Sequence, residues 1–389
     1  MANKCSELAE KSGENAAVKY KKKWLDQCIR LYSQKMRYDN FIATCRRNMN
    51  RTEAAKFEYR TDENNHVWIV SLNGKKTKDA SRRMTRALSD TQDLLCIPET
   101  INGRTVVGID PQAFRNEDKI NAVFLPDTVT EIGSQAFENC SSLTTVQASS
   151  ALTSIGSRAF AETSALSSFT FPQTLTAVGA ESFTGSGIVT ANLPQSVTYL
   201  GAGAFADCTK LVYAQVPAAI QAVRERTFRN CTELKNVSIP EGIRYIGAAA
   251  FQNDVSLQTV DFAQSLLTIC DNAFEGSGVG EGLVLPPALR TIGSRAFAGC
   301  MRLTSLTIPA DIRKMGSQAF ADGSSPSIVC AFSRTTYMSK LASGWVADWG
   351  SGLGALTFTG GAVNDEQKAA FLQMICKLVP DFNASEANN

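Results

Sequence analysis

Histidine is the rarest residue type of this sequence, whose 389 residues contain only one, His66. A zinc site built on a histidine pair, and a Ser-His or Cys-His catalytic pair anywhere except beside His66, are therefore excluded. Phosphate-binding glycine-rich loops and closely spaced cysteine pairs are also missing from the sequence. We expect no enzyme activity, no metal site and no cofactor.

Long apolar runs are absent as well: no stretch of about 18 apolar residues occurs, which predicts no membrane-spanning helix. Residues 1–10, MANKCSELAE, lack the apolar segment of a secretory signal. We therefore expect a cytoplasmic protein, and a secreted or surface-exposed one as the alternative if a signal was removed. The 11 cysteines are an odd number without paired spacing, which favours reduced thiols.

Charge is nearly balanced overall, at +2, but its distribution is uneven. Residues 1–90 carry 20 Lys and Arg against 11 Asp and Glu, whereas residues 91–389 carry 19 against 26. The composition therefore divides the chain near residue 90. Within the basic part, two alternating segments at 57–61 and 67–74 flank the turn 62–65 and predict a β-hairpin.

Residues 16–50 place apolar side chains at three- and four-residue steps, which predicts one or two amphipathic helices. Their polar face is basic, and its candidate contact residues for phosphate or a partner are Lys21, Lys22, Lys23, Arg30, Arg46 and Arg47. The alternative is a solvated surface of a helix that caps the rest of the fold. We expect nucleic acid to bind, if at all, only through residues 1–90.

Through the middle of the chain a phenylalanine recurs every 23 residues, with one step of 22. The ten residues are Phe114, Phe137, Phe160, Phe183, Phe205, Phe228, Phe251, Phe274, Phe297 and Phe320. An aliphatic residue stands five positions before each, and glycine usually stands four before, as in Ile132 and Gly133. A fixed period of this length indicates a solenoid whose units bury their apolar faces against each other. We predict coils about 4.8 Å apart, with the ten rings in one internal stack.

The pattern also predicts that each repeat unit contains two short extended segments, one on either side of the core. The glycine before the phenylalanine indicates a corner with a left-handed or crowded backbone. Four cysteines fall three residues after a phenylalanine, at Cys140, Cys208, Cys231 and Cys300. We expect buried free thiols there, with a disulfide between Cys208 and Cys231 in adjacent coils as the alternative.

Residues 239–257, IPEGIRYIGAAAFQNDVSL, carry a family resemblance. They follow the pattern IPxx[VIL]xxIGxxAFxxCxxL except for Asp254 in place of cysteine, and resemble the BspA-like leucine-rich repeat. The resemblance implies a mainly β, right-handed leucine-rich-repeat solenoid of about ten 23-residue coils with a sheet on its concave face. Members of this family are often bacterial surface proteins that bind host or other proteins. Residues 327–345 resemble the terminal strand and short helix of the family.

The outward strand positions of the concave sheet carry mostly short, uncharged polar side chains. Candidate ligand-binding residues are Phe124, Gln147, Asn192, Tyr213, Gln215, Lys235, Asn236 and Asp261. We expect Phe124 and Tyr213 to be exposed aromatic residues, which often anchor interfaces. The alternative is that these side chains merely suit an exposed strand. A nucleic-acid groove would need more Lys and Arg than this face has.

Three regions are thus expected: a basic helical region with a hairpin over 1–90, a solenoid over 91–330, and a C-terminal cap and helix over 331–389. The final helix is predicted at 364–379 and either docks on the cap or binds a partner. We expect a non-enzymatic interaction module that binds a protein, or alternatively a glycan, on the concave sheet. A secreted or surface adhesin and a nucleic-acid-associated factor acting through the basic helices are the alternatives.

Overall fold

The computed structural model describes residues 57–72, 94–280, 282–343, 345–346 and 348–360. The chain divides into two compact units, Met1–Glu53 and Ala54–Asn389, and all described residues belong to the second. The helices predicted over 16–50 and 364–379 lie outside the described residues.

The predicted hairpin is confirmed: β1 (Phe57–Thr61) pairs antiparallel with β2 (Val67–Leu72). Asp62 closes the turn, where its Oδ1 accepts the backbone N–H groups of Asn64 and His66 at 3.0 and 2.9 Å. β2 also pairs in parallel with β5 (Arg104–Ile109), so the hairpin joins the sheet of the solenoid. The charge distribution placed the hairpin in the basic region 1–90, whereas its strands hydrogen-bond to the solenoid. Net charge does not indicate which strands pair.

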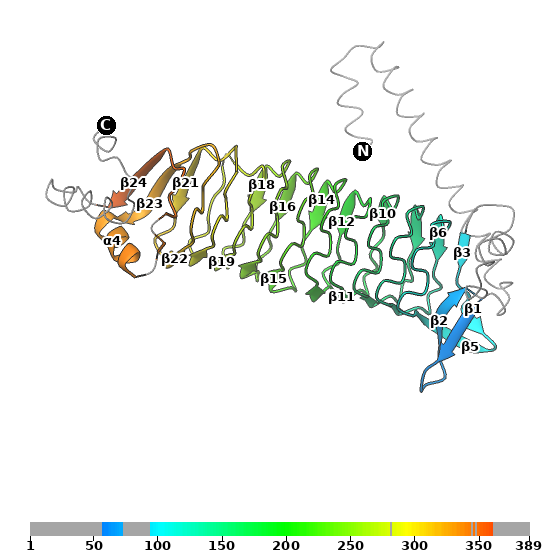
Figure 1. The fold of residues 1–389 in the computed structure, drawn as a ribbon. Coiled ribbons are helices and arrows are strands. Elements are labelled where there is room, and N and C mark those ends of the chain that lie inside the picture. The colour runs from blue at the N-terminus through cyan, green and yellow to red at the C-terminus, as the bar shows by residue number, and fades with distance from the viewer. Residues whose placement is uncertain (1–56, 73–93, 281, 344, 347, 361–389) are drawn as a thin grey trace, which may run out of the picture. The chain divides into compact units, whose positions relative to one another are not determined.

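After the hairpin the chain forms a β-solenoid in which most coils contribute one strand to each of two faces (Figure 1). The short-strand face contains β5, β7 (Glu131–Ile132), β9 (Ser154–Ile155), β11 (Ala177–Val178), β13 (Tyr199–Leu200), β15 (Ala222–Val223), β17 (Tyr245–Ile246), β19 (Thr268–Ile269), β20 (Thr291–Ile292) and β22 (Lys314–Met315). The long-strand face contains β3 (Leu94–Cys96), β6 (Ala122–Phe124), β8 (Thr145–Gln147), β10 (Ser168–Phe169), β12 (Thr190–Asn192), β14 (Tyr213–Gln215), β16 (Asn236–Ser238), β18 (Thr259–Asp261), β21 (Ser305–Ile308), β23 (Ser327–Ser333) and β24 (Ala355–Gly360). In the first coil, β4 (Thr100–Ile101) additionally pairs with β5.

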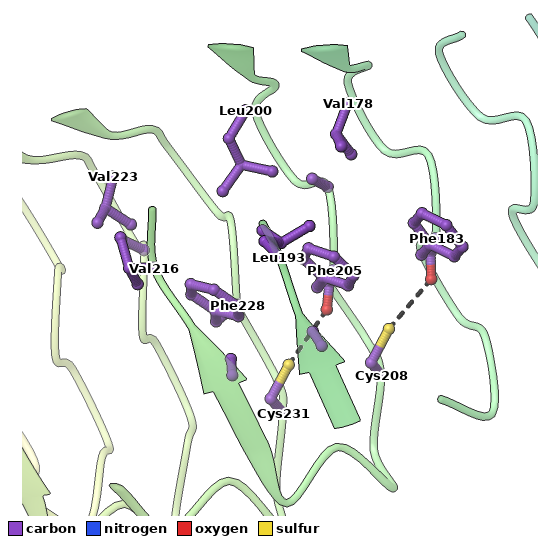
Figure 2. Close-up of a cluster of buried hydrophobic side chains, with 14 of the residues drawn as sticks. Val178, Phe183, Leu193, Leu200, Phe205, Cys208, Val216, Val223, Phe228 and Cys231 are labelled. Atoms are coloured by element: carbon purple, nitrogen blue, oxygen red, sulfur yellow. Dashed lines mark hydrogen bonds between the residues drawn. The ribbon is translucent and has the colours of Figure 1, made fainter. Parts of the chain in front are cut away.

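The predicted phenylalanine stack is confirmed between the two faces. Neighbouring ring centroids lie 5.1–5.8 Å apart with interplanar angles of 4–16°. All ten side chains are fully buried. Figure 2 shows three of them in a row, Phe183, Phe205 and Phe228. Burying each ring contributes about 1.5–3 kcal/mol to folding.

The backbone around each phenylalanine shows what the corner glycine does. The left-handed residues stand two positions before and two after the ring, as at Gln135 (φ 59°) and Asn139 (φ 60°). The corner glycine is instead crowded: a Cβ on Gly156 would lie 2.5 Å from the backbone N of Ser134 in the preceding coil. Of the two reasons predicted for glycine, the close approach of two backbones is the one that applies.

The cysteines three residues after a phenylalanine are buried and free. Each thiol donates a hydrogen bond to the carbonyl of the phenylalanine one coil earlier, at 3.0 Å from Cys208 to Phe183 and 3.1 Å from Cys231 to Phe205 (Figure 2). Cys208 and Cys231 therefore do not form the alternative disulfide.

Both faces contain breaks in hydrogen bonding. The short-strand face divides into two sheets between β13 and β15, where Arg224 stands in place of the corner glycine. There the Phe205 and Phe228 centroids are 5.8 Å apart, the widest spacing of the stack. The long-strand face divides after β10 and after β18, which leaves β12, β14, β16 and β18 as one four-stranded sheet.

The C-terminal end of the stack is closed by aromatic residues. After β23, α4 (Arg334–Ala342) begins at Ser333, whose Oγ accepts the Thr336 N–H, and this confirms the predicted terminal strand and helix. Trp349 packs edge-on against Phe320 with 6.2 Å between the rings, and its indole N–H donates to the Tyr337 hydroxyl at 3.2 Å.

Candidate ligand-binding face

The four-stranded sheet β12–β14–β16–β18 presents two rows of polar side chains on its outer surface. Its strands alternate, with exposed residues on either side of one buried residue. Parallel pairing aligns Thr190, Tyr213, Asn236 and Thr259 in the first row. The second row contains Asn192, Gln215, Ser238 and Asp261. We call these eight residues, together with Lys235, the ligand face.

Tyr213 stands near the middle of the ligand face and is 47% exposed. Its in-register neighbours are Thr190 and Asn236, and Asn236 accepts a hydrogen bond from the Thr259 hydroxyl at 2.6 Å. The inward residues of the same strands, such as Ala214 and Val237, are buried in the core. The solenoid core therefore supports a ring whose outer surface is open to a partner.

Five of the eight predicted site residues lie on the strands of this sheet, and a sixth, Lys235, directly precedes β16. They are Asn192, Tyr213, Gln215, Lys235, Asn236 and Asp261, and all six are exposed. Gln147 lies on β8 in another sheet of the same face and is half-buried.

The prediction that Phe124 is exposed is wrong, because its side chain is only 2% exposed. It lies on β6 between two in-register residues, Cys96 of β3 and Gln147 of β8. Strand alternation indicates which face a side chain occupies but not what packs against that face. Phe124 therefore supplies no surface for a ligand. The predicted basic residues Lys21, Lys22, Lys23, Arg30, Arg46 and Arg47 lie outside the described residues.

The buried thiols are unsuited to nucleophilic chemistry. Burial raises the pKa of the Cys208 and Cys300 thiols to about 12, so both remain protonated near neutral pH. Among the described residues no group of His, Cys, Asp and Glu side chains is arranged to hold a metal ion.

A second surface, which the sequence analysis did not single out, follows the turns around the core phenylalanines. We define the turn edge as the row of residues two positions before and one position after each phenylalanine. Glu138 on this edge is buried and pairs with Arg115 at 2.6 Å and Arg158 at 2.7 Å. The hydrogen bond to Glu138 is the main cause that raises the pKa of Arg158.

A related cluster lies further along the turn edge, where one arginine is shared between two carboxylates, one of them Asp322 just beyond the edge. Arg295 pairs with Glu275 at 2.8 Å and with Asp322 at 3.0 Å. Partial burial alone would raise the pKa of Glu275, but hydrogen bonds from Arg295, Gln252 and Asn272 outweigh it and lower the pKa. The recurrence of Arg and Glu two positions before and one position after the phenylalanines is the sequence feature that would have identified this edge.

Comparison with known proteins agrees with the geometry. The profile of the BspA type leucine rich repeat region, six repeat copies long, matches residues 97–212 and 202–327. These ranges cover more than half of the chain, which therefore belongs to this family. None of the curated proteins matches the chain.

The solved structures that resemble the chain include the following three. A leucine-rich repeat protein from Bacteroides ovatus is 25% identical with a TM-score of 0.65, over 78% of this chain and 75% of its own. The leucine-rich repeat protein of T. pallidum is 25% identical with a TM-score of 0.45, over 52% of this chain and 88% of its own. The pneumococcal vaccine antigen PcpA is 19% identical with a TM-score of 0.38, over 79% of this chain and 97% of its own. The fold assignment relies on the first of these.

Among the residues that the structure describes, no helix is long and apolar enough to cross a membrane.

Proposed function

We propose that this chain is a non-enzymatic interaction module that binds a protein ligand on the ligand face. The observation that carries the proposal is the pair of in-register polar rows around the exposed ring of Tyr213. Tyrosine supplies a large, amphipathic contact at low entropic cost, and neighbouring Ser and Asn side chains supply adaptable hydrogen bonds. Parallel pairing fixes the first row along all four strands and the second row within each of its two strand pairs, so the face is preorganised, which lowers the cost of binding.

A glycan is the second candidate ligand, favoured by the same residues. Asn192, Gln215 and Asn236 present amides, and Asp261 presents a carboxylate, so the face offers both donors and acceptors to hydroxyl groups. Tyr213 offers an apolar ring face beside them. A protein that binds in this way would fit an adhesin-type role as well as an intracellular scaffold.

The test compares capture of ligands by matched variants of the full chain. The double variant Tyr213→Ala with Asn236→Ala removes the centre of the ligand face. Tyr245→Ala is the control, because Tyr245 is also 47% exposed but lies on the short-strand face. We expect recovery of a specific protein or glycan to fall at least tenfold in the double variant and to persist in the control. Equal recovery by both would contradict the proposal.

The basic N-terminal residues support a separate proposal, that residues 1–53 contact nucleic acid. Its test is salt-dependent binding to mixed-sequence duplex DNA and RNA by the full chain and by a chain that begins at Ala54. Truncation at residue 90 would be a poor test, because it also removes the hairpin that pairs with β5. Equal affinity of both chains would remove this proposal.

A further inference from the structure

One coil departs from the pairing pattern of the turn edge. The coil of Phe228 contains three arginines on a single turn, Arg224, Arg226 and Arg229. In the part of the chain that the structure describes, none of the three forms an ion pair, whereas Arg115, Arg158 and Arg295 all do.

The repeats provide an internal comparison for Arg226, which stands two positions before its phenylalanine, as Arg158 does. Arg158 is held between Glu138 of the preceding coil and Glu181 of the following coil. The positions equivalent to these two glutamates around Arg226 are Ala206 and Ala249. Both carboxylates that would neutralise Arg226 are therefore replaced by methyl groups.

Arg229 lies beside Arg226 on the same turn. In two other coils the residues at these two positions hydrogen-bond to each other: Gln135 donates to Glu138 at 2.8 Å, and Asn272 donates to Glu275 at 2.7 Å. Arg226 and Arg229 occupy the same two positions, and the backbone N–H of Arg229 donates to the Arg226 carbonyl at 3.1 Å, so two cationic side chains start from one turn. Like charges repel, and an anion bound between them removes the repulsion.

Within the described part of the chain, the Nε atom of Arg229 is buried without a hydrogen-bond partner, and Arg229 forms no ion pair, whereas the Nε of Arg115, at the equivalent position of its coil, lies 2.6 Å from the Glu138 carboxylate. A guanidinium N–H that is removed from water needs an acceptor, and an oxyanion held by two arginines supplies several. Unlike Arg115, Arg158 and Arg295, Arg226 is exposed, so a ligand from solution has access to this turn.

The nearest acidic residues along the chain do not fill this role. Glu225 lies between Arg224 and Arg226 in sequence but forms an ion pair with neither. Asp207 of the preceding coil accepts a hydrogen bond from Asn230 at 2.6 Å. Arg224 packs over the ring of Tyr199, with 4.9 Å between its Cζ and the ring centroid.

We propose that Arg226 and Arg229, with Arg224 beside them, form a binding site for the phosphate or sulfate ester group of a ligand. The planar guanidinium fork matches such oxyanions in a bidentate geometry. The site uses no residue of the ligand face, so it is a second binding function of the same chain.

The test titrates the full chain at low ionic strength with inorganic sulfate, inorganic phosphate, glucose 6-sulfate, glucose 6-phosphate and glucose. Calorimetry measures affinity, and nitrogen-15 NMR of arginine side chains follows the Nε of Arg229. We expect saturable binding of all four anions with a shift of the Arg229 signal, and no binding of glucose. Binding of the inorganic ions without the esters would overturn the proposal, as would the absence of saturable anion binding.

Two variants locate the site. Arg226→Gln with Arg229→Gln should weaken anion binding at least tenfold, whereas Arg302→Gln, which removes an exposed arginine elsewhere, should change it less than twofold. Ala249→Glu supplies to Arg226 the carboxylate that Glu181 of the following coil supplies to Arg158, at the same left-handed position. It should also weaken binding at least tenfold, and Ala310→Glu, which adds the same charge elsewhere, should not. Binding that survives both site variants would place the anion elsewhere and overturn the assignment.

Discussion

At the residue scale, the position three residues after a core phenylalanine is occupied by different polar side chains. Several of these side chains donate a hydrogen bond to a phenylalanine carbonyl. Cysteine at Cys140 and Cys208 donates to a phenylalanine carbonyl of the preceding coil, and Thr163 donates to the carbonyl of Phe160 at 2.7 Å. Asp254 is different: its Oδ1 accepts the Cys231 N–H at 2.8 Å, and its Oδ2 is buried without a partner. Burial raises the pKa of Asp254 well above its usual value, and the hydrogen bond from Cys231 only partly opposes this.

We predict that Asp254→Ser stabilises the protein more at pH 7 than at pH 3.5. The carboxyl of the unfolded chain ionises near pH 3.9, but the folded protein keeps its proton to higher pH. The contribution of Asp254 to wild-type stability therefore falls as pH rises through this window, and the variant loses this contribution. Urea unfolding at both pH values should therefore show a larger gain in the free energy of unfolding for Asp254→Ser at pH 7 than at pH 3.5.

Cys208→Ser is the control for this experiment, because it changes the same buried position without a group that titrates between pH 3.5 and 7. An equal pH dependence of Asp254→Ser and wild type would show that Asp254 ionises normally in the fold.

The core ring of a central coil provides a second prediction. Phe228→Ala should lower the free energy of unfolding by about 3–5 kcal/mol, because the cavity weakens the contacts with Phe205 and Phe251 together. Urea denaturation measures the change, and the exposed Tyr245→Ala should stay within about 0.5 kcal/mol of wild type. A loss below about 1 kcal/mol for Phe228→Ala would show that the stack does not hold adjacent coils together.

At the element scale, each coil is positioned by the close approach of corner backbones. Gly156→Ala should destabilise the fold by about 1–3 kcal/mol, because the new Cβ meets the Ser134 backbone. Cys270 occupies the same position in another coil while its N–H still bonds to the Ile246 carbonyl at 2.9 Å, so Cys270→Ala should cost less. The urea unfolding midpoints of both variants measure the two losses of stability. An unchanged midpoint for Gly156→Ala would show that the backbones of neighbouring coils are not in contact at this position.

The coils were predictable from sequence because equivalent residues recur at one period. Ile132, Gly133 and Phe137 recur as a set, and this set determines the core, the corner and the stack. The ends of the hydrogen-bonded sheets at β10, β13 and β18 were not predictable. The repeat period shows which positions are equivalent, but not whether neighbouring strands form their hydrogen bonds. For the same reason the burial of Phe124 and the unpaired state of Arg226 required the neighbouring coils to be seen in space.

At the scale of the whole molecule, the solenoid unit begins before the repeats do. A chain that starts at Ala54 should retain the thermal midpoint of the solenoid transition, because β1 and β2 still cover the edge of β5. A chain that starts at residue 91 should unfold at lower temperature and self-associate, because the part of β5 that β2 covers, Val106 to Ile109, is then unpaired. Calorimetry with light scattering measures both effects, and identical behaviour of the two chains would show that the hairpin adds nothing to the unit.

The interaction proposed above places a partner on the outer surface of β12, β14, β16 and β18. Site-specific photo-crosslinking measures this most directly, with p-benzoylphenylalanine placed at Tyr213 or at Tyr245, two positions of equal exposure on different faces. We predict a crosslinked adduct with the ligand at position 213 and none at position 245. Adducts at 245, or a ligand that binds without ever crosslinking at 213, would contradict the claim.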